Sequence, residues 1–579
     1  MSKKGSRRPR RERDIGARET VKSRSVERAS PLGTPLESTT AAGLSRHVPL
    51  LIVIAVMLLV ALVRLRIADV PLERDEGEYA YAGQLILQGI PPYQLAYNMK
   101  FPGTYYAYSV IEALFGQTAW GIHVGLLFVN AATTLLVFLL GRRLLGTFGG
   151  AISAIAFAIL SVDRWIMGVF AHATHFVILP ALAGFLLLLR ALDSRSRLGL
   201  AVAGMLLGVA VLMKQQAIFF MPLAFGLVIW NQGKPRNLRD IVFRCALVGL
   251  GAAVPFLVMC AVFVAQGVFD RFWFWTFQYA REYVSEIPLS AAWGSFVTGW
   301  ESVTRATLLL WLLAAAGTAL LWLVRWTTEV RVFLAGLLLA SLLALSPGFY
   351  FRQHYFILII PVAALLIGVA CVSIRRIAER IVPRAAARTI SVLIFVVAAA
   401  AYTIKEQEYL VLMPSRDLSR AVYGMNPFVE SADIARYIEE HTKPDDRIAV
   451  LGSEPQIYFY ARRKSATGYI YTYPLMEEQR YAQRMQDEMI REIGSLHPAY
   501  VVLVDIRTSW LARSPNEKIL TWAGSYIRQC YDLAGVADIH SRERSELQWD
   551  AAAASYQPQS RNIVYTFRRR SDAPCTLAT

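Results

Sequence analysis

The stretch VPLLIVIAVMLLVALV, residues Val48 to Val63, decides the class of fold. It carries no charged side chain and is long enough to cross most of a hydrocarbon core about 30 Å thick. Comparable apolar runs recur as far as Tyr402. Of the 579 residues, 55% are hydrophobic and only 18% are charged, a composition that excludes a soluble globule of this size. The sequence therefore predicts a polytopic α-helical membrane protein.

The apolar runs predict about eleven membrane spans by length. We place them near residues 48–64, 119–140, 148–162, 174–192, 198–213, 217–231, 241–265, 306–324, 331–346, 355–373 and 389–403. Alternate connections hold most of the basic residues, which favours the cytoplasmic side for these connections and for the N terminus. An odd number of spans then puts the long connection 65–118 and everything after Tyr402 on the outer side.

The chain divides into three predicted parts. Residues 1–47 are rich in Arg, Lys, Ser and Pro, and we expect a disordered cytoplasmic arm. Residues 48–403 form the transmembrane domain, and residues 404–579 form an outer domain. Strands and helices alternate in this last part, which predicts a small α/β domain with a mainly parallel sheet.

The formal net charge of +17 does not indicate a nucleic-acid partner. Much of the excess lies in the first 47 residues and in short loops between apolar runs, where basic residues orient a membrane protein. Of the five cysteines, only Cys530 and Cys575 lie in the polar tail, so a disulfide is open to this pair alone.

The densest polar signal follows the first span, in the stretch ERDEGEYAYAG from Glu73 to Gly83. It contains four carboxylates, and several tyrosines follow. A solvated acidic turn with an aromatic belt at the lipid headgroups gives the same pattern. A carboxylate at a membrane surface can also act as a general base toward a hydroxyl group, with Lys100 as a nearby cation for phosphate. The residues alone leave both interpretations open.

At this stretch the chain resembles the GT-C glycosyltransferases that use polyprenyl-phosphate sugars, specifically the protein O-mannosyltransferase and aminoarabinose-transferase branch. That family has an acidic pair after the first helix, then a Tyr, Gly-x-x-Pro, and Lys-x-Pro followed by aromatic residues. The corresponding residues are Asp75-Glu76, Tyr79, Gly89 with Pro92, and Lys100-Phe101-Pro102 followed by Tyr105 and Tyr106.

The resemblance implies a glycosyltransferase in the bacterial inner membrane. It would move a sugar, a hexose such as mannose or a related sugar, from a polyprenyl-phosphate donor to a hydroxyl group of a protein, lipid or glycan. Asp75 would be the catalytic base, with Glu76 beside it. The residues expected at the donor phosphate are Lys100, Lys214, Arg352, His354 and Tyr355, and those expected to contact acceptor or lipid are Tyr79, Tyr105, Tyr106 and Arg271.

A divalent metal ion is a further possibility that the residues leave open. The aminoarabinose branch has a metal-binding carboxylate just before the Lys, and this chain has Met99 there. His172 and His175 are three apart, so one helix would put them on the same face, where they could bind a metal with a carboxylate of the first outer loop. Interfacial or phosphate-contacting histidines would give the same spacing.

Two rival functions remain. A lipid or sugar transporter would have a similar number of spans, but it would be expected to place ionisable residues at mid-membrane, whereas here they collect at helix ends. A non-catalytic scaffold could retain the fold.

Lys214 lies in a short turn between two apolar runs and has an alternative to phosphate binding. Its ammonium group could extend to the lipid headgroups.

Overall fold

The computed structural model describes residues 39–231, 237–512, 517–570 and 575, with side chains from Val48 onward. The chain divides into two compact units, Met1–Val48 and Pro49–Thr579. Helix α1 (Thr39–Arg66) contains the first predicted span and begins within the predicted arm. The rest of that arm lies outside the described residues.

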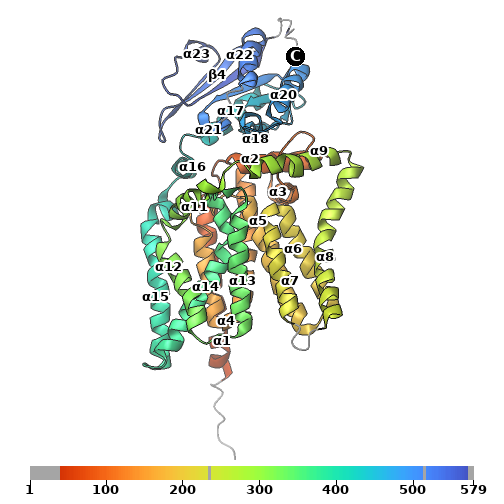
Figure 1. Cartoon of the computed structure of the whole chain (residues 1–579). Coiled ribbons are helices and arrows are strands. Elements are labelled where there is room, and N and C mark those ends of the chain that lie inside the picture. The colour runs from red at the N-terminus through yellow and green to blue at the C-terminus, as the bar shows by residue number, and fades with distance from the viewer. Residues whose placement is uncertain (1–38, 232–236, 513–516, 571–574, 576–579) are drawn as a thin grey trace, which may run out of the picture. The chain divides into compact units, whose positions relative to one another are not determined.

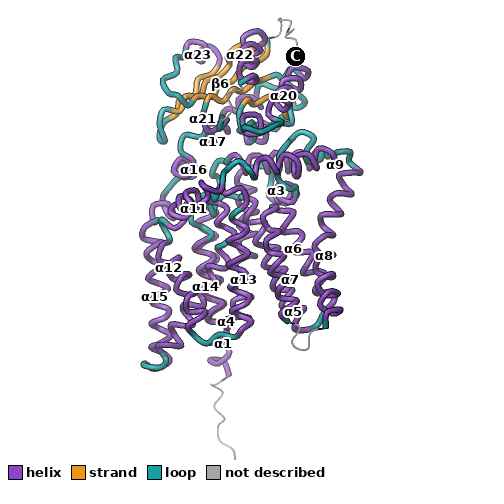
Figure 2. Tube along the Cα trace, in the orientation of Figure 1, coloured by secondary structure: helices purple, strands orange, loops and turns teal. Residues whose placement is uncertain are grey.

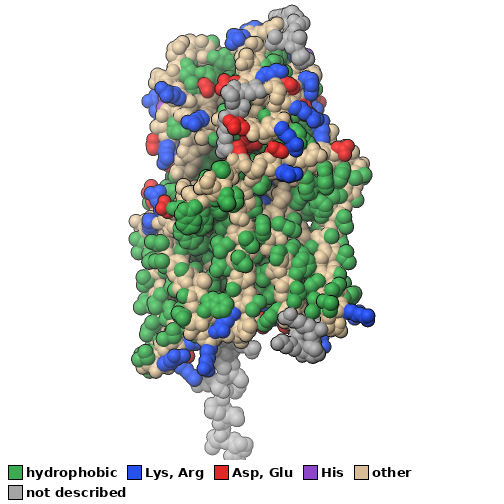
Figure 3. All heavy atoms as spheres, in the orientation of Figure 1, with side chains coloured by type: hydrophobic (Ala, Val, Ile, Leu, Met, Phe, Trp, Pro, Cys, Tyr) green, Lys and Arg blue, Asp and Glu red, His purple; other side chains and the backbone are tan. Residues whose placement is uncertain are grey.

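The membrane part is a bundle of helices in which long segments run alongside one another (Figures 1 and 2). After α1, its apolar helices are α4 (Ala119–Leu160), α5 (Ala173–Ser194), α6 (Arg197–Met213), η1 (Gln215–Phe220) with α7 (Met221–Trp230), α8 (Leu238–Ala265), α12 (Leu308–Leu323), α13 (Thr328–Leu345), α14 (Ile360–Ala378) and α15 (Arg384–Lys405). Hydrophobic side chains cover most of the visible surface of these helices (Figure 3). Such a surface suits contact with lipid.

Helix α4 reverses direction at Gly146. This residue has φ 81°, a conformation that glycine adopts at little cost. A Cβ atom on Gly141 would lie only 2.7 Å from Cα of Gly150, although nine residues of straight helix rise about 13 Å. The label α4 therefore covers two antiparallel segments, in agreement with the two spans predicted near 119–140 and 148–162.

Every predicted span corresponds to helix, but fewer helices meet a strict test of length and composition. Among the described residues seven helices are long and apolar enough to cross a membrane, or up to eight if the bent pair α11 (Leu289–Thr304) and α12 counts as one span. Helices α6 and η1–α7 fall in a shorter class of apolar helix. The test counts α4 once, despite its reversal. The prediction of about eleven spans is therefore larger than the number that this test supports.

The predicted outer loop 65–118 folds into α2 (Arg74–Leu87) and α3 (Gly103–Phe115). A capping box between Glu73 and Glu76 starts α2, because each side chain accepts a hydrogen bond from the other's backbone N–H. Tyrosines of this loop are buried rather than arranged as a belt at the lipid surface, and the fully buried ones are Tyr81, Tyr93, Tyr105 and Tyr108.

Short helices lie between the membrane helices and the C-terminal part. They are α9 (Phe269–Trp273), the π-helix η2 (Phe274–Tyr279), α10 (Ala280–Val284), η3 (Pro347–Phe349), η4 (Gln353–Leu358), the π-helix η5 (Glu408–Leu412) and α16 (Ser415–Tyr423). A π-helix is rare and often marks a functional region.

The C-terminal domain contains one six-stranded sheet with the order β2-β1-β3-β6-β4-β5. Its strands are β1 (Arg447–Leu451), β2 (Lys464–Ser465), β3 (Tyr500–Asp505), β4 (Tyr531–Ile539), β5 (Ser545–Trp549) and β6 (Ile563–Arg569). Its helices are α17 (Phe428–Glu440), α18 (Gln456–Ala461), α19 (Tyr473–Met476), α20 (Ala482–Leu496), α21 (Arg507–Trp510), α22 (Lys518–Cys530) and α23 (Asp550–Ser555).

The prediction of a mainly parallel sheet is wrong. Strand β1 pairs in parallel with β2 and β3, but the β3–β6, β6–β4 and β4–β5 pairs are antiparallel. The connection between β4 and β5 is too short for a parallel crossover, so these strands form a hairpin. The predicted disulfide is confirmed: Cys530, the last residue of α22, is bonded to Cys575, with a Cα–Cα distance of 5.4 Å.

Candidate active site

A cavity of about 390 Å³ lies beside the first turn of α2. Its walls come from five places that are far apart in the chain: α2, the loop before α3, the junction of α6 with η1, the segment η2–α10, and the region around η3 and η4. Residues of the C-terminal domain close it. The polar and aromatic residues that line it include Asp75, Tyr79, Lys100, Lys214, Tyr279, Tyr283, Arg352, His354, Tyr355, Tyr471, Tyr473 and Glu477.

Asp75 is the central carboxylate of this cavity. The Oδ1 atom accepts hydrogen bonds from Lys100 Nζ at 2.8 Å and from the Tyr471 hydroxyl at 2.7 Å. The Oδ2 atom lies 3.9 Å from His172 Nδ1 and 4.0 Å from His354 Nε2. One oxygen is therefore fully engaged by donors, while the other faces two imidazole rings and has room for a further partner.

Lys100 is held by two carboxylates. Its Nζ donates to Asp75 and, at 2.6 Å, to Glu78 Oε2, and it lies 4.5 Å from the centroid of the Tyr79 ring. The Tyr105 hydroxyl donates to the other oxygen of Glu78 at 2.5 Å. Glu78, itself held by Tyr105, thus keeps the Lys100 ammonium group in position, and Lys100 in turn keeps the Asp75 carboxylate in position.

The charge state of Asp75 follows from these contacts. Burial is the largest single influence on Asp75 and raises its pKa, but the charges and the hydrogen bond around it, led by the Lys100 ammonium, together outweigh burial. The pKa of Asp75 is held well below its usual value. Burial lowers the pKa of His172 to about 4 and also lowers that of His354 well below its usual value, so both rings are neutral near pH 7. The cavity therefore contains an ionised carboxylate next to neutral imidazoles.

The rings of His172 and His354 stack with centroids 4.1 Å apart. With Asp75 they form a group whose potential metal-ligating atoms all lie within 4.8 Å of one another. Nδ1 of His172 is buried and makes no hydrogen bond among the described residues. Two neutral imidazoles and a carboxylate are suitable ligands for a divalent ion such as Zn²⁺.

The sequence suggested His175 as the neighbour of His172, but in the structure His354 rather than His175 lies in this group. His172 is the N-cap of α5, with extended backbone angles of −62° and 149°, and therefore lies outside the helical repeat that would have put it on one face with His175. The ring of His175 is buried, and neither of its nitrogens has a hydrogen-bond partner in the part of the chain that the structure describes.

Lys214 and Arg352 line the same cavity and differ from Lys100 in one respect. Within the described residues, neither of them makes an ion pair with a carboxylate. Lys214 Nζ lies 4.0 Å from the centroid of the Tyr355 ring, and the Arg352 guanidinium lies 5.2 Å from that of Tyr350. Burial lowers the pKa of Lys214 to about 7, and an anionic ligand beside it would favour the charged form. Two basic side chains held mainly by aromatic faces suit such a ligand.

Besides His172 and His175, four of the predicted site residues do not line this cavity: Glu76, Tyr105, Tyr106 and Arg271. Tyr105 lies behind it, hydrogen-bonded to Glu78. Glu76 faces away from the cavity and accepts from His123 Nε2 at 2.9 Å and from the backbone N–H of Ala171 at 2.5 Å, so it anchors α2 to the helical bundle. Tyr106 is half-buried and does not line the cavity. Arg271 lines a different pocket.

The prediction missed the contributions of the C-terminal domain. Tyr471 contacts Asp75 directly, and Tyr473 and Glu477 also line the cavity. Tyr471 follows Asp75 by 396 positions. No local spacing could have connected them, although the aromatic string YIYTYP near residue 471 was a signal of a surface that other residues cover.

Part of the chain is similar to known sequences. Residues 100–259 match the family described as dolichyl-phosphate-mannose-protein mannosyltransferase. The undecaprenyl phosphate-alpha-4-amino-4-deoxy-L-arabinose arabinosyl transferase of Pseudomonas aeruginosa (strain LESB58) is 27% identical over 228 residues. That alignment covers 37% of this chain and 40% of the relative, so it spans less than half of the relative's length.

Solved structures share the fold over most of the chain. ArnT from Cupriavidus metallidurans, bound to undecaprenyl phosphate, has a TM-score of 0.56 at 16% identity, covering 89% of this chain and 97% of that one. Archaeal oligosaccharyltransferase AglB from Archaeoglobus fulgidus, in complex with an inhibitory peptide and a dolichol-phosphate, has a TM-score of 0.51 at 13% identity, covering 89% and 75%. The predicted fold class is confirmed: this is a polytopic helical protein of GT-C type with a C-terminal α/β domain.

Proposed function

We propose that the protein is a membrane glycosyltransferase that uses a polyprenyl-phosphate sugar as donor and a hydroxyl group as acceptor. The observation that carries this proposal is the composition of one cavity. It holds an ionised carboxylate, Asp75, together with two basic side chains, Lys214 and Arg352, that form no ion pair with a described carboxylate. A general base and an anion-binding group within the same site are what transfer from a phosphate leaving group to a hydroxyl requires.

In the proposed reaction, Asp75 accepts the proton of the acceptor hydroxyl through Oδ2, the oxygen that Lys100 and Tyr471 leave free. The acceptor oxygen bonds to the anomeric carbon of the sugar. The bond between that carbon and the phosphate oxygen breaks, and polyprenyl phosphate leaves with the electron pair. Lys214 and Arg352 stabilise its negative charge in a site of low dielectric constant.

The donor class has support from both kinds of comparison. The matched family and the arabinosyl transferase relative are named for lipid-phosphate sugars, and two solved neighbours contain undecaprenyl phosphate or dolichol-phosphate. We propose a hexose such as mannose, or a related sugar, as the transferred group, and a protein, lipid or glycan as the acceptor. The reaction would take place at the outer face of the bacterial inner membrane, with the N terminus cytoplasmic.

Transport explains these features less well. In the described part of the chain, the ionisable residues of the cavity lie at the ends of apolar helices or in the segments between them, and the C-terminal domain covers them. A transporter would be expected to have ionisable or broken segments near mid-membrane.

The test is an assay with purified protein in lipid nanodiscs. A panel of undecaprenyl-phosphate sugars is supplied with hydroxyl-bearing acceptors, and release of undecaprenyl phosphate is followed together with product mass. We expect release with at least one donor in the wild-type protein and none in Asp75→Asn. Absence of release with the whole panel would contradict the proposal. Comparison of surface glycans from cells with and without the protein then identifies the acceptor.

A further inference from the structure

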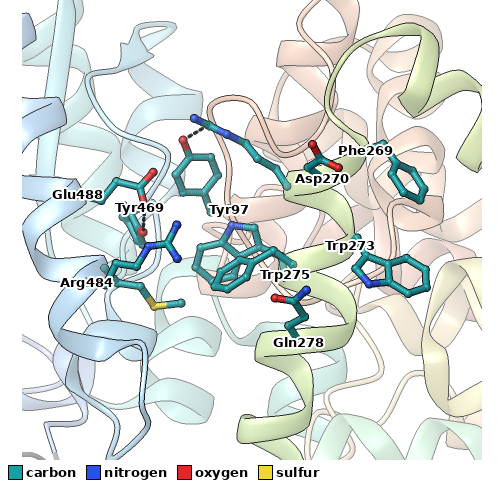
Figure 4. Close-up of a pocket in the computed structure, with 12 residues that line it drawn as sticks. Tyr97, Phe269, Asp270, Trp273, Trp275, Gln278, Tyr469, Arg484 and Glu488 are labelled. Atoms are coloured by element: carbon teal, nitrogen blue, oxygen red, sulfur yellow. Dashed lines mark hydrogen bonds between the residues drawn. The ribbon is translucent and has the colours of Figure 1, made fainter.

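A second, larger pocket of about 760 Å³ lies between the segment α9–η2 and helix α20 (Figure 4). On one side it is lined by Phe269, Asp270, Arg271, Trp273, Phe274, Trp275 and Gln278, and on the other by Tyr469, Arg484, Met485 and Glu488, with Tyr97 between them. Volumes of about 300–1,000 Å³ are usual for small-ligand sites.

The base of this pocket is a rigid aromatic cluster. The rings of Tyr97 and Trp275 stack with centroids 5.6 Å apart, and the ring of Tyr469 meets Tyr97 edge-on at 5.1 Å. Tyr97, Trp275 and Tyr469 are each at most 3% exposed, and the Tyr469 hydroxyl donates to Glu488 at 2.9 Å. Trp273, by contrast, is 42% exposed and offers an open ring at the edge of the pocket.

The polar side chains around this cluster carry both signs of charge. Asp270 and Glu488 are acidic, Arg271 and Arg484 are basic, and Gln278 adds an amide. Over the described residues, none of these four charged groups forms an ion pair. Arg484 lies over the Phe274 ring at 5.9 Å, and Arg271 donates to the Tyr97 hydroxyl. The pocket therefore offers hydrogen-bond donors and acceptors, and the formal charges of its acidic and basic side chains cancel.

This pocket shares its walls with the cavity that contains Asp75. Trp275 and Gln278 line the pocket, whereas Thr276 and Tyr279 of the same π-helix line the cavity. The loop that provides Tyr97 to the pocket continues into Asn98–Phe101, which line the cavity. A molecule bound in the pocket would therefore lie next to the catalytic residues, separated from them by one turn of helix and one loop.

We propose that this pocket binds a saccharide portion of the acceptor. Sugar rings present C–H faces that pack on aromatic rings, and their hydroxyl groups pair with carboxylates, guanidinium groups and amides. The zero net charge favours a neutral saccharide over a free phosphate or a strongly charged peptide. This assignment rests on the proposed glycosyl transfer and narrows its acceptor to a glycan or a glycosylated molecule.

Binding can be measured without turnover. Asp75→Asn protein in nanodiscs is applied to an array of neutral oligosaccharides of two to four sugars, alongside arrayed peptides and anionic lipid vesicles. We expect at least one oligosaccharide to bind, and its apparent Kd to rise at least tenfold in Trp273→Ala and Arg484→Gln. Trp293→Ala is the matched control, because Trp293 is 73% exposed and does not line the pocket. Its Kd should equal that of the unsubstituted protein.

A transfer assay separates this inference from the proposed function. In otherwise wild-type protein, Trp273→Ala and Arg484→Gln should raise KM for the oligosaccharide acceptor while release of undecaprenyl phosphate to water stays unchanged. Unchanged KM in both variants, or preferential binding of peptides or vesicles, would overturn the pocket assignment and leave the transferase intact. In the binding experiment, failure of every oligosaccharide to bind at millimolar concentration would also overturn the pocket assignment. Absence of undecaprenyl phosphate release from every donor would instead contradict the proposed transferase function.

Discussion

The basic side chains of the cavity differ in their partners. Lys100 lies between Asp75 and Glu78, with a carboxylate oxygen of each within 2.8 Å of its Nζ. Lys214 and Arg352 form no ion pair with a carboxylate among the residues that the structure describes, and aromatic rings lie beside them. A paired lysine holds a neighbouring base in its charged form, whereas an unpaired cation retains its attraction for an incoming anion.

This difference assigns separate tasks to residues that look alike in the sequence. All three cations were expected to contact the donor phosphate. In the folded protein, Lys100 is hydrogen-bonded to Asp75, whereas Lys214 and Arg352 have no carboxylate partner among the described residues. We therefore propose that Lys100 positions Asp75 and that Lys214 and Arg352 contact the phosphate.

Asp75→Asn should abolish sugar transfer while leaving the protein folded and inserted. The substitution is close to isosteric and removes the proton acceptor, and a general base contributes about 10²–10⁴-fold to rate. Product formation by purified protein is the measurement. Glu78→Gln is the comparison, and its loss should be much smaller because Asp75 and its contact with Lys100 remain. Full activity of Asp75→Asn would refute the assignment of the base.

Lys214→Ala and Arg352→Ala should weaken use of the lipid-phosphate donor by roughly 10- to 100-fold in kcat/KM, as expected for loss of a charge-assisted contact. Part of the loss should be a higher KM for the donor. Lys100→Ala should differ, lowering kcat with a smaller change in donor KM, because the base loses its positioning partner. Steady-state kinetics with varied donor concentration measures both. Identical kinetic profiles for all three variants would show that Lys100 is not functionally distinct from Lys214 and Arg352.

Glu76→Gln should destabilise the protein without removing the chemistry. Glu76 is fully buried and accepts from His123 and from the backbone of Ala171, so weakening these bonds costs about 2 kcal/mol. A lower midpoint of thermal unfolding in detergent, with transfer retained per folded molecule, is the expected result. If the variant were as stable as the wild type but inactive, Glu76 would belong to the catalytic machinery after all.

The smallest expected effect concerns metal binding by Asp75, His172 and His354. Zn²⁺ added to metal-stripped protein at about tenfold excess over Kd should stabilise it by about 1.4 kcal/mol. The readout is the thermal midpoint with and without Zn²⁺. The shift should disappear in His354→Ala and persist in His175→Ala. A shift that disappears in His175→Ala and persists in His354→Ala would instead support His172 and His175 as the metal-binding pair.

The sequence by itself determined the membrane class, the helical segments, the presence of a C-terminal domain of strands and helices, and the acidic pair after the first helix. These features depend on local signals: long apolar runs must satisfy their backbone as helices in lipid, and motif residues occupy fixed spacings. The family resemblance singled out Asp75, Lys100, Lys214, Arg352 and His354, and these residues line one cavity in the structure.

Only the tertiary structure decided which of those residues line the cavity and which partners each of them contacts. The direction of a side chain on α2 separates Asp75, which lines the cavity, from Glu76, which anchors the helix, although the two are adjacent in sequence. The extended backbone of His172 removes it from the helical repeat and pairs it with His354, which is 182 positions away. Tyr471 reaches Asp75 from a different domain. Contacts between residues so far apart depend on packing of whole elements, and no local pattern records them.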